Sequence, residues 1–330
     1  MRVAILTTSY PQNASDPAGH FVAAEAAHLT EQGHEVHVVT PGIRPIERAR
    51  DHGEKVWWMG ARRLFGFPGA LPRLRENPFR ALELSWFVPR VRRRLSAIAP
   101  IDRIVAHFLV PSGYPLALDA APEIEVVLHG SDVRLVLAMP HGLRRHIVRR
   151  LLTARATFRF VSHDLRQRFL AGLAPPEREG VEMACRVELP RIVVPPSESR
   201  RRPPASRERW VVCGRLIAGK RIDRAIHVAA ERGAHLTVVG DGPMYGELRQ
   251  LAASLGGVVD FLGHLPRDQA LAQIANADRL VHLSEAEGCP TVVREARALG
   301  VPVLAAPVGD LVAWAAADPG IEIHGSLPAR

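Results

Sequence analysis

The stretch WVVCGRLIAGKRIDRAIHVAAERGAHLTVVGDGP, residues 210–243, decides the fold class of this chain. An apolar run at 210–215 is followed by a helical pattern at 221–232 and by a second apolar run at 235–240. Unbroken apolar runs, in contrast to alternating ones, are typical of strands that are buried on both faces of a parallel sheet. The stretch therefore predicts a strand–helix–strand unit with a right-handed crossover.

The same alternation recurs along most of the 330 residues. Further strands are predicted at 2–8, 35–41, 101–107, 123–129, 157–162, 258–263, 279–284 and 301–306, and further helices at 19–33, 243–255, 267–276 and 290–299. A segment rich in proline and arginine at 195–209 interrupts the alternation and is typical of a linker. We therefore expect two α/β domains, an N-terminal one at 1–198 and a C-terminal one at 199–330.

The composition excludes several classes of protein. Hydrophobic residues make up 47% of the chain and charged residues 23%, so each half can bury a core and wholesale disorder is excluded. The three cysteines lack the spacing of a disulfide framework or of a zinc site. No apolar run approaches the roughly 18 residues of a membrane span, and the first residues lack the apolar core of a signal peptide. We therefore expect a cytoplasmic protein.

Several cofactor and metal motifs are absent from the sequence. The loop after the first predicted strand lacks the G-x-G-x-x-G of a dinucleotide site, and VVGDGP at 238–243 lacks the third glycine. The chain also contains no Walker A motif, no HExxH, no GxSxG and no Asp-x-Asp. A nicotinamide enzyme is therefore not expected, and no residues are assigned to a metal ion.

Two cations follow a predicted strand in GRLIAGK, residues 214–220. A tight turn would bring Arg215 and Lys220 together at the carboxyl end of the sheet, where open α/β folds bind ligands. Two cations there suit a diphosphate leaving group, whose negative charge rises as its bond to a sugar breaks. The alternative is that both charges are solvated on a surface loop.

Two glutamates, Glu287 and Glu295, are eight residues apart in EAEGCPTVVREARALGVPV at 285–303. Pro290 is expected in the first turn of the helix that follows, so Glu287 would lie on the loop and Glu295 in the helix. The loop from Gly288 would present backbone N–H groups at the positive end of that helix, which is a ready anion site. A solvated helix face is the alternative interpretation of such a pair.

These motifs resemble those of the retaining glycosyltransferases of family 4, whose GT-B fold has two Rossmann-like parallel-sheet domains facing each other across a cleft. GRLIAGKRID at 214–223 is similar to their diphosphate-binding segment, and EGCPTVVREARALGVPV at 287–303 to their E-x7-E signature. Four stretches of the first half are similar to motifs of the family's N-terminal domain. They are the opening segment 7–41, AHFLVPSG at 106–113, VVLHGSD at 126–132 and FRFVSHDLRQRF at 158–169. The resemblance covers about the whole chain except 43–100.

The resemblance implies five residues that bind the donor. Arg215 and Lys220 would bind its diphosphate, and Gly288 would contribute to the anion site. Gly19 would let the backbone approach the phosphate because it has no Cβ. Glu295 would accept hydrogen bonds from the nucleotide ribose.

The resemblance also implies two catalytic candidates. Glu287 would lie beside the hydroxyls of the donor sugar, and His129 near the transferred sugar. A buried histidine that is satisfied by the backbone is the alternative for His129. His107 ranks second among the histidines, and its expected role is structural.

The expected reaction is retaining transfer of a sugar from a nucleoside-diphosphate donor to a hydroxyl of a sugar, a lipid-linked or a small-molecule acceptor. The resemblance implies no cofactor and no metal ion, with front-face attack and protein cations at the leaving group. An epimerase of the same fold and a non-catalytic nucleotide-binding module are the alternatives. The sequence ends at HGSLPAR, residues 324–330, so the usual terminal helices of the family are not expected, and Cys289 replaces an aromatic residue of the family.

Positive charge gathers in the N-terminal half of a chain whose net charge is +9. The segment 62–94 carries nine arginines and two glutamates, with five interleaved aromatic residues, Phe65, Phe67, Phe79, Trp86 and Phe87. One interpretation is an amphipathic helix pair whose arginine stems cover apolar surface. The other is docking to an anionic membrane surface or to a lipid-linked acceptor, which would place the protein at the inner membrane face. Nucleic acid is not an expected partner, because no recognised module accompanies the charge.

Overall fold

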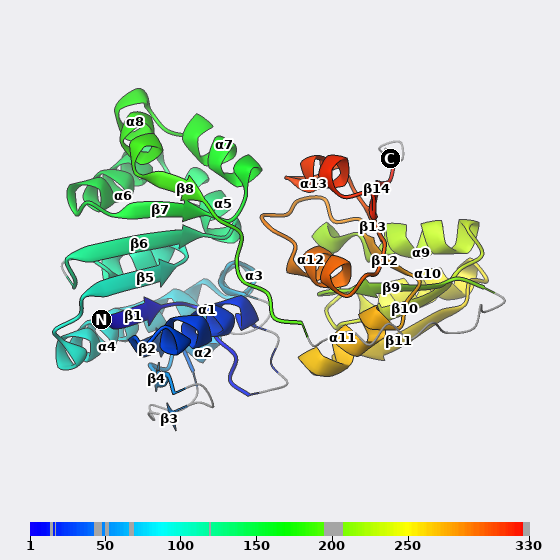
Figure 1. Cartoon of the computed structure of the whole chain (residues 1–330), viewed down its shortest axis with the longest axis horizontal. Coiled ribbons are helices and arrows are strands. Elements are labelled where there is room, and N and C mark those ends of the chain that lie inside the picture. The colour runs from blue at the N-terminus through cyan, green and yellow to red at the C-terminus, as the bar shows by residue number, and fades with distance from the viewer. Residues whose placement is uncertain are drawn as a thin grey trace. The chain divides into compact units, whose positions relative to one another are not determined.

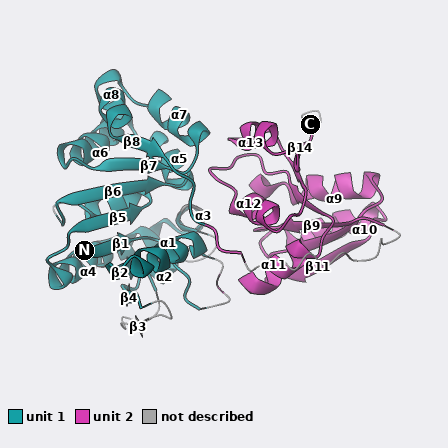
Figure 2. Ribbon diagram, viewed as in Figure 1, with its two compact units in different colours: residues 1–13, 18–191 teal, residues 14–17, 192–330 magenta. Residues whose placement is uncertain are grey.

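The computed structural model describes residues 1–13, 16, 18–42, 48–49, 53–65, 69–118, 120–194 and 207–325. The chain forms two compact units, one of residues 1–13 and 18–191 and one of residues 14–17 and 192–330 (Figure 2). The predicted boundary between residues 198 and 199 falls within 195–206, outside the described residues.

The first unit is built on a sheet with the strand order β3-β4-β2-β1-β5-β6-β7-β8 (Figure 1). Its strands are β1 (Arg2–Leu6), β2 (Glu35–Thr40), β3 (Arg48–Ala49), β4 (Lys55–Trp58), β5 (Arg103–His107), β6 (Glu123–Leu128), β7 (Thr157–Phe160) and β8 (Cys185–Val187). All neighbours pair in parallel except β3, which runs antiparallel to β4. The last four residues of β1 and the last five of β2 and β6 are all buried, as expected for strands covered on both faces.

Helices connect these strands and cover the sheet (Figure 1). They are α1 (His20–Glu31), α2 (Arg62–Phe65), α3 (Ala70–Glu76), η1 (Pro78–Leu82), α4 (Glu83–Ile98), the irregular segment η2 (Leu109–Leu116), α5 (Ser131–Leu137), α6 (His141–Thr153), α7 (His163–Ala171) and α8 (Pro175–Met183). No helix in the described part of the chain combines the length and the apolar content that a bilayer crossing needs.

The second unit has a fully parallel sheet with the order β11-β10-β9-β12-β13-β14. Its strands are β9 (Arg209–Cys213), β10 (His235–Val239), β11 (Val259–Gly263), β12 (Arg279–His282), β13 (Val303–Ala305) and β14 (Ile321–Ile323). The helices are η3 (Ala218–Lys220), α9 (Ile222–Glu231), α10 (Tyr245–Ser254), α11 (Arg267–Ala275), α12 (Thr291–Ala298) and α13 (Leu311–Ala317).

Strand β9 shows how the sequence builds this unit. Its side chains alternate between two cores: Trp210 and Val212 pack in the core that contains residues of α9 and α10, and Val211 packs in the core that contains residues of α11 and α12. Because both faces are covered, the buried residues 210–212 of this strand have to be apolar, which is the pattern that predicted the strand–helix–strand unit. The prediction of two parallel α/β units is confirmed.

The predicted strands and helices are all present, but four strands of the described part of the chain were not predicted: β3, β4, β8 and β14. Each belongs to a sheet edge or lies next to one. Strand β4 alternates between half-buried and buried residues, so it lacks the unbroken apolar run by which the interior strands were found. Pro290 is also placed differently, because it precedes α12 as its N-cap and does not lie in the first turn.

The described part of the segment 62–94 is folded as α2, α3, η1 and the beginning of α4. Helix α4 buries one apolar face through Phe87, Val91, Leu95 and Ile98. Phe65 packs against Phe87, with 5.2 Å between the ring centroids. This is the amphipathic arrangement expected from the sequence, whereas Phe67 lies outside the described residues.

Candidate functional site

The loop that follows β9 lies against the backbone after β10. The amide of Gly214 donates to the carbonyl of Val239 at 2.9 Å, and the amide of Leu216 donates to the carbonyl of Asp241 at 2.9 Å. A Cβ at Gly240 would lie 1.9 Å from the carbonyl oxygen of Gly214, and residue 240 has a φ of +140°. Only glycine fits this approach, so the glycines of VVGDGP make room for the GRLIAGK loop.

This loop carries Lys220 to the residues that follow β12. The amide of Glu285 donates to the carbonyl of Gly219 at 3.0 Å. The Nζ atom of Lys220 donates to Oε1 of Glu287 at 2.6 Å, and both side chains are largely buried. The structure therefore joins two of the predicted site residues, while Arg215 lies exposed at the start of the same loop.

A third member of this cluster, His282, was not predicted. It is the last residue of β12, is 5% exposed, and its Nε2 atom lies 3.0 Å from Oε1 of Glu287. Burial by itself raises the pKa of Glu287, but His282 and Lys220 outweigh burial and hold that pKa well below its ordinary value. Glu287 is therefore ionised at neutral pH. The only signal in the sequence is a polar residue at the end of the apolar run RLVH.

The cation next to Lys220 has different partners. Arg221 donates to both carboxylate oxygens of Asp223 and to Oε1 of Glu285, the last at 2.8 Å. The hydrogen bonds to Asp223 raise the pKa of Arg221 further, so its charge is permanent and committed to two carboxylates. Of the two adjacent cations in GKRID, the structure thus pairs Lys220 alone with Glu287.

Glu295 is the fifth residue of α12 and is 6% exposed. Its Oε1 atom accepts a hydrogen bond from Nη2 of Arg267 at 2.8 Å, and this guanidinium also donates to the carbonyl of Val193 at 2.8 Å. Burial, with the charge of Glu295 added, raises the pKa of the neighbouring Cys213 to about 12. Glu295 is thus a buried carboxylate near the carboxyl end of β9, and Gly288 lies partly exposed on the loop before α12.

In the first unit, Gly19 is the residue before α1 and has a left-handed φ of +66°. A Cβ at this position would lie 2.1 Å from the carbonyl oxygen of Ser9. The close approach of the loop after β1 to the start of α1 therefore requires glycine. The predicted role of Gly19 at a phosphate stays a prediction.

The backbone around His129 is held by a buried carboxylate. The amides of His129 and Gly130 donate to Oδ1 of Asp132 at 3.1 and 2.9 Å, and the amide of Leu109 donates to Oδ2 at 2.9 Å. Asp132 is 3% exposed, and burial raises its pKa against the opposite effect of these bonds. Asp132, another residue that sequence reasoning missed, thereby joins the loops that follow β5 and β6.

The ring of His129 lies among aromatic side chains, and the residue as a whole is partly exposed. Its centroid is 4.7 Å from that of Phe21 and 4.8 Å from that of Phe108. Its Nε2 atom is 3.0 Å from Nδ1 of His107, which ends the neighbouring strand β5. Burial lowers the pKa of both histidines well below the ordinary value, and the charge of Arg159 adds to this effect, so both rings are neutral at pH 7.

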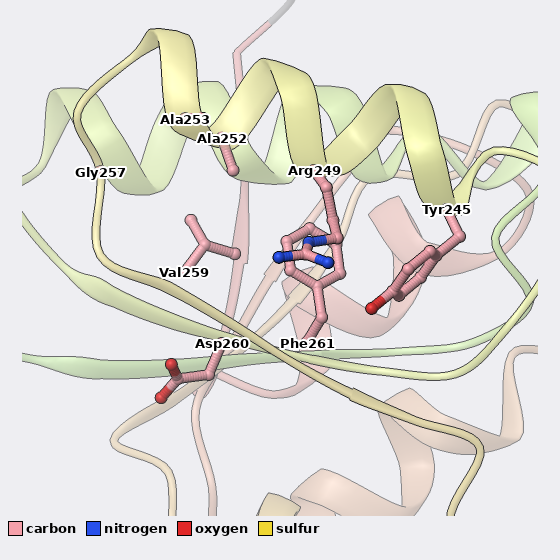
Figure 3. Close-up of a pocket in the computed structure, with 8 residues that line it drawn as sticks. All are labelled: Tyr245, Arg249, Ala252, Ala253, Gly257, Val259, Asp260 and Phe261. Atoms are coloured by element: carbon pink, nitrogen blue, oxygen red, sulfur yellow. The ribbon is translucent and has the colours of Figure 1, made fainter.

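A separate hollow of about 410 Å³ lies between α10 and β11 (Figure 3). Its lining residues are Tyr245, Arg249, Ala252, Ala253, Gly257, Val259, Asp260 and Phe261. None of the predicted site residues lines it. Within the described ranges, no three His, Cys, Asp or Glu side chains are grouped as a metal site would need.

Known proteins match both the sequence and the structure. The family model "Glycosyl transferases group 1" matches residues 197–313. A Bacillus subtilis (strain 168) protein named as a teichuronic acid biosynthesis glycosyltransferase, TuaC, is 30% identical over 94% of this chain and 82% of its own length. A Mycolicibacterium smegmatis protein named GDP-mannose-dependent alpha-mannosyltransferase is 29% identical over 95% of this chain and 82% of its own.

Among solved structures, Anabaena HepE in complex with UDP and glucose superposes with a TM-score of 0.66 at 18% identity, over 95% of this chain and 82% of that chain. This similarity concerns the fold, and together with the two parallel sheets it confirms the expected GT-B fold.

Replacement of Glu287 by Gln should lower the free energy of unfolding at neutral pH, because the ion pair with Lys220 is lost. The folded-state pKa of Glu287 lies below its ordinary value of 4.5, so the contribution of the carboxylate is fully present above that value. It is lost as the pH falls through the folded-state pKa. The difference in stability between the parent and E287Q should therefore be constant down to about pH 5 and shrink below it.

Denaturant unfolding at a series of pH values, without any donor present, measures this difference. The matched control is Glu247→Gln, since Glu247 is an exposed carboxylate on α10, and its stability should follow the parent at every pH. If the stability difference between the parent and E287Q instead grows toward acid pH, the folded protein stabilises the protonated form of Glu287. That result would contradict the ion pair with Lys220.

Proposed function

Because the chain belongs to the glycosyltransferases and its second unit carries a group 1 glycosyl transferase domain, we propose that it is a retaining, metal-independent enzyme of family 4. It transfers a sugar from a nucleoside-diphosphate donor to an acceptor hydroxyl. The cluster of Lys220, Glu287 and His282 carries this proposal, since it places one fixed cation and one ionised carboxylate at the carboxyl end of the second sheet.

Lys220 is suited to a diphosphate because Glu287 uses one of its three N–H donors. Among the described residues the two others have no partner, so they can donate to phosphate oxygens, and Arg215 adds a second charge from the exposed part of the loop. The amides from Gly288 to the start of α12 supply further donors at a positive helix end. One relative is named for GDP-mannose and one similar structure holds UDP, so the proposal covers nucleoside diphosphates as a class.

The chemistry follows from where charge develops in the transition state. As the bond between the sugar and the phosphate breaks, negative charge grows on the diphosphate, and Arg215 and Lys220 stabilise it in place of a metal ion. The ionised Glu287 accepts hydrogen bonds from the donor sugar hydroxyls. The departing phosphate takes the proton of the acceptor hydroxyl in a front-face attack, and His129 contacts the transferred sugar.

The first prediction from the proposed function concerns the two cations. Replacement of Lys220 or Arg215 by Ala should weaken the binding of UDP or GDP about tenfold or more, because a charge-assisted hydrogen bond contributes about 1.5–3 kcal/mol. Titration calorimetry with both nucleotides measures the affinity. Arg232→Ala is the matched control, since Arg232 is an exposed arginine at the far end of α9, and its affinity should equal that of the parent.

Lys220→Ala also leaves Glu287 without its cation, so the double variant K220A/E287Q is needed. If it binds nucleotide as weakly as K220A, the loss comes from the missing ammonium. Recovery of full affinity in the double variant would show that repulsion by Glu287 caused the loss. Unchanged affinity in both K220A and R215A would disprove the donor assignment.

The second prediction separates chemistry from binding. His129→Ala should lower turnover far more than donor affinity, because its contact with the sugar matters mostly in the transition state. Glu295→Ala should lower donor affinity and turnover by the same factor, since a ribose hydrogen bond holds donor and transition state alike. Donor hydrolysis for a panel of UDP- and GDP-sugars gives the turnover, after circular dichroism has shown that both variants are folded.

Two outcomes would change the proposal. Full turnover in His129→Ala, or equal losses of turnover and affinity, would make His129 a structural residue at the end of its strand. Recovery of an epimerised donor sugar would identify the enzyme as an epimerase of the same fold.

We also propose that η1 and the start of α4 dock to an anionic membrane surface, which would place the protein at the inner face of the membrane. Phe79, Leu82 and Trp86 are 78%, 66% and 40% exposed, although they belong to the residue types that proteins usually bury. They are three and four residues apart, a spacing that puts them on one side of consecutive helical turns. Arg90 lies over the ring of Trp86, with 5.1 Å from its Cζ to the ring centroid. Apolar side chains amid an arginine-rich surface suit anionic lipids and a lipid-linked acceptor.

The third prediction tests this surface. Vesicles that contain phosphatidylglycerol should sediment more protein than vesicles of phosphatidylcholine alone, and raised salt should release it. The double variant F79S/L82S should lose binding, whereas Met183→Ser, at an 89% exposed position on α8, should keep it. Equal sedimentation with both kinds of vesicle would leave only the structural role of the segment.

A further inference from the structure

A chain of polar contacts runs from the surface of the first unit to a buried arginine. It starts at His129, whose Nε2 atom is 3.0 Å from Nδ1 of His107. The other ring nitrogen of His107, Nε2, faces Oε2 of Glu25 on α1 at 3.5 Å, an electrostatic contact without hydrogen-bond geometry. The second oxygen of Glu25 forms a short ion pair with Arg159 of β7. Three residues of β5, α1 and β7 and one residue of the loop after β6 are thus neighbours in one line.

The environment of each residue in this line determines which of its atoms carries a proton. The side chain of His107 is 1% exposed and that of Glu25 is 13% exposed. Glu25 is paired with a guanidinium, so it is an anion that accepts hydrogen bonds. A neutral imidazole has one N–H and one lone pair, and a lone pair turned toward a carboxylate is repelled. Nε2 of His107 therefore carries the proton, and Nδ1 of His107 is the acceptor.

The same reasoning extends to the next ring. Because Nδ1 of His107 is an acceptor, Nε2 of His129 has to carry a proton in order to bond to it. His129 is neutral, so its Nδ1 atom is left with a bare lone pair. Among the described residues, Nδ1 of His129 has no hydrogen-bond partner, and the residue is partly exposed.

Backbone strain supports a functional role for this arrangement. Phe108 directly follows His107 and has a left-handed φ of +74°, which is rare for a residue with a large side chain. The conformation places its ring against that of His129, 4.8 Å between centroids. Strain of this kind concentrates at functional sites, where it helps to hold a side chain in place.

We infer that Glu25 and His107 are positioning residues that fix the tautomer of His129, so that His129 presents a hydrogen-bond acceptor, Nδ1, to a hydroxyl group of the substrate. This inference rests on the proposed contact between His129 and the transferred sugar. It adds the direction of the hydrogen bond, since the hydroxyl donates and the imidazole accepts. A group without a donor hydrogen would leave the lone pair unsatisfied and would be disfavoured.

The experiment reads the tautomer directly. Protein labelled with 15N-histidine gives long-range 1H–15N correlation spectra that distinguish a protonated from a bare ring nitrogen, and H129N and H107N assign the two rings. In the parent protein, His129 should carry its proton on Nε2. This measurement needs no substrate, and it decides the inference even if a variant at Glu25 fails to fold.

Glu25→Gln should reverse the direction of the hydrogen bond between His107 and His129. The amide oxygen of the new side chain can accept from Arg159, and its NH2 group then donates to Nε2 of His107. His107 would carry its proton on Nδ1 and donate to His129, whose proton would move to Nδ1. The control is Glu188→Gln, because Glu188 also faces Arg159, at 3.6 Å, without touching His107. Its spectra should match those of the parent.

Turnover supplies the second readout. Glu25→Gln should lower donor hydrolysis about tenfold, the loss expected for one hydrogen bond made by a reacting group, while UDP or GDP affinity stays unchanged. A parent spectrum with the proton on Nδ1 of His129, or an unchanged tautomer in E25Q, overturns the inference. If the tautomer is as inferred and H129A keeps full turnover, the positioning chain is confirmed and the catalytic role of His129 is what fails.

Discussion

All strands of a parallel sheet end at the same edge, and every candidate residue of this protein depends on that constraint. In the second unit, β9 and β12 are neighbours, so the loops that follow them meet although Lys220 and Glu287 are 67 residues apart in the chain. Strand β10 lies on the other side of β9, and Gly240 lets the two loops touch without a side chain between them. The ion pair between Lys220 and Glu287 is therefore a consequence of strand order.

In the first unit, the same constraint brings two histidines together. His107 ends β5 and His129 follows β6, and these strands are neighbours, so the two rings meet. The strands β6 and β7 of this sheet also carry buried charged residues. Glu125 and Arg159 are 1% and 6% exposed, and such charges are costly to bury unless they are paired. Each is paired here, Glu125 with Arg103 at 2.8 Å and Arg159 with Glu25.

The interior strands were predictable, because a strand covered on both faces leaves an unbroken apolar run. Edge strands leave weaker signals: β14 has only three residues, and β4 alternates between half-buried and buried residues. The site was predictable in part. Loop positions at the ends of predicted strands indicated Lys220 and Glu287, whereas the phosphate role of Gly19, which the resemblance implies, stays a prediction. His282, Asp132 and Glu25 were missed, because each is a single polar residue next to an apolar run or on the inner side of a helix.

The sequence by itself determined two α/β units with parallel sheets, their interior strands, and the loops at which charged residues gather. These are local properties, since hydrophobic burial and the backbone freedom of glycine act within a few residues. Only the tertiary structure decided which charges are partners: Lys220 with Glu287 while its neighbour Arg221 bonds to Asp223 and Glu285, and Glu25 with an arginine 134 positions away. Such partners are set by strand order and by the side of the sheet on which a helix lies, and no local pattern records either.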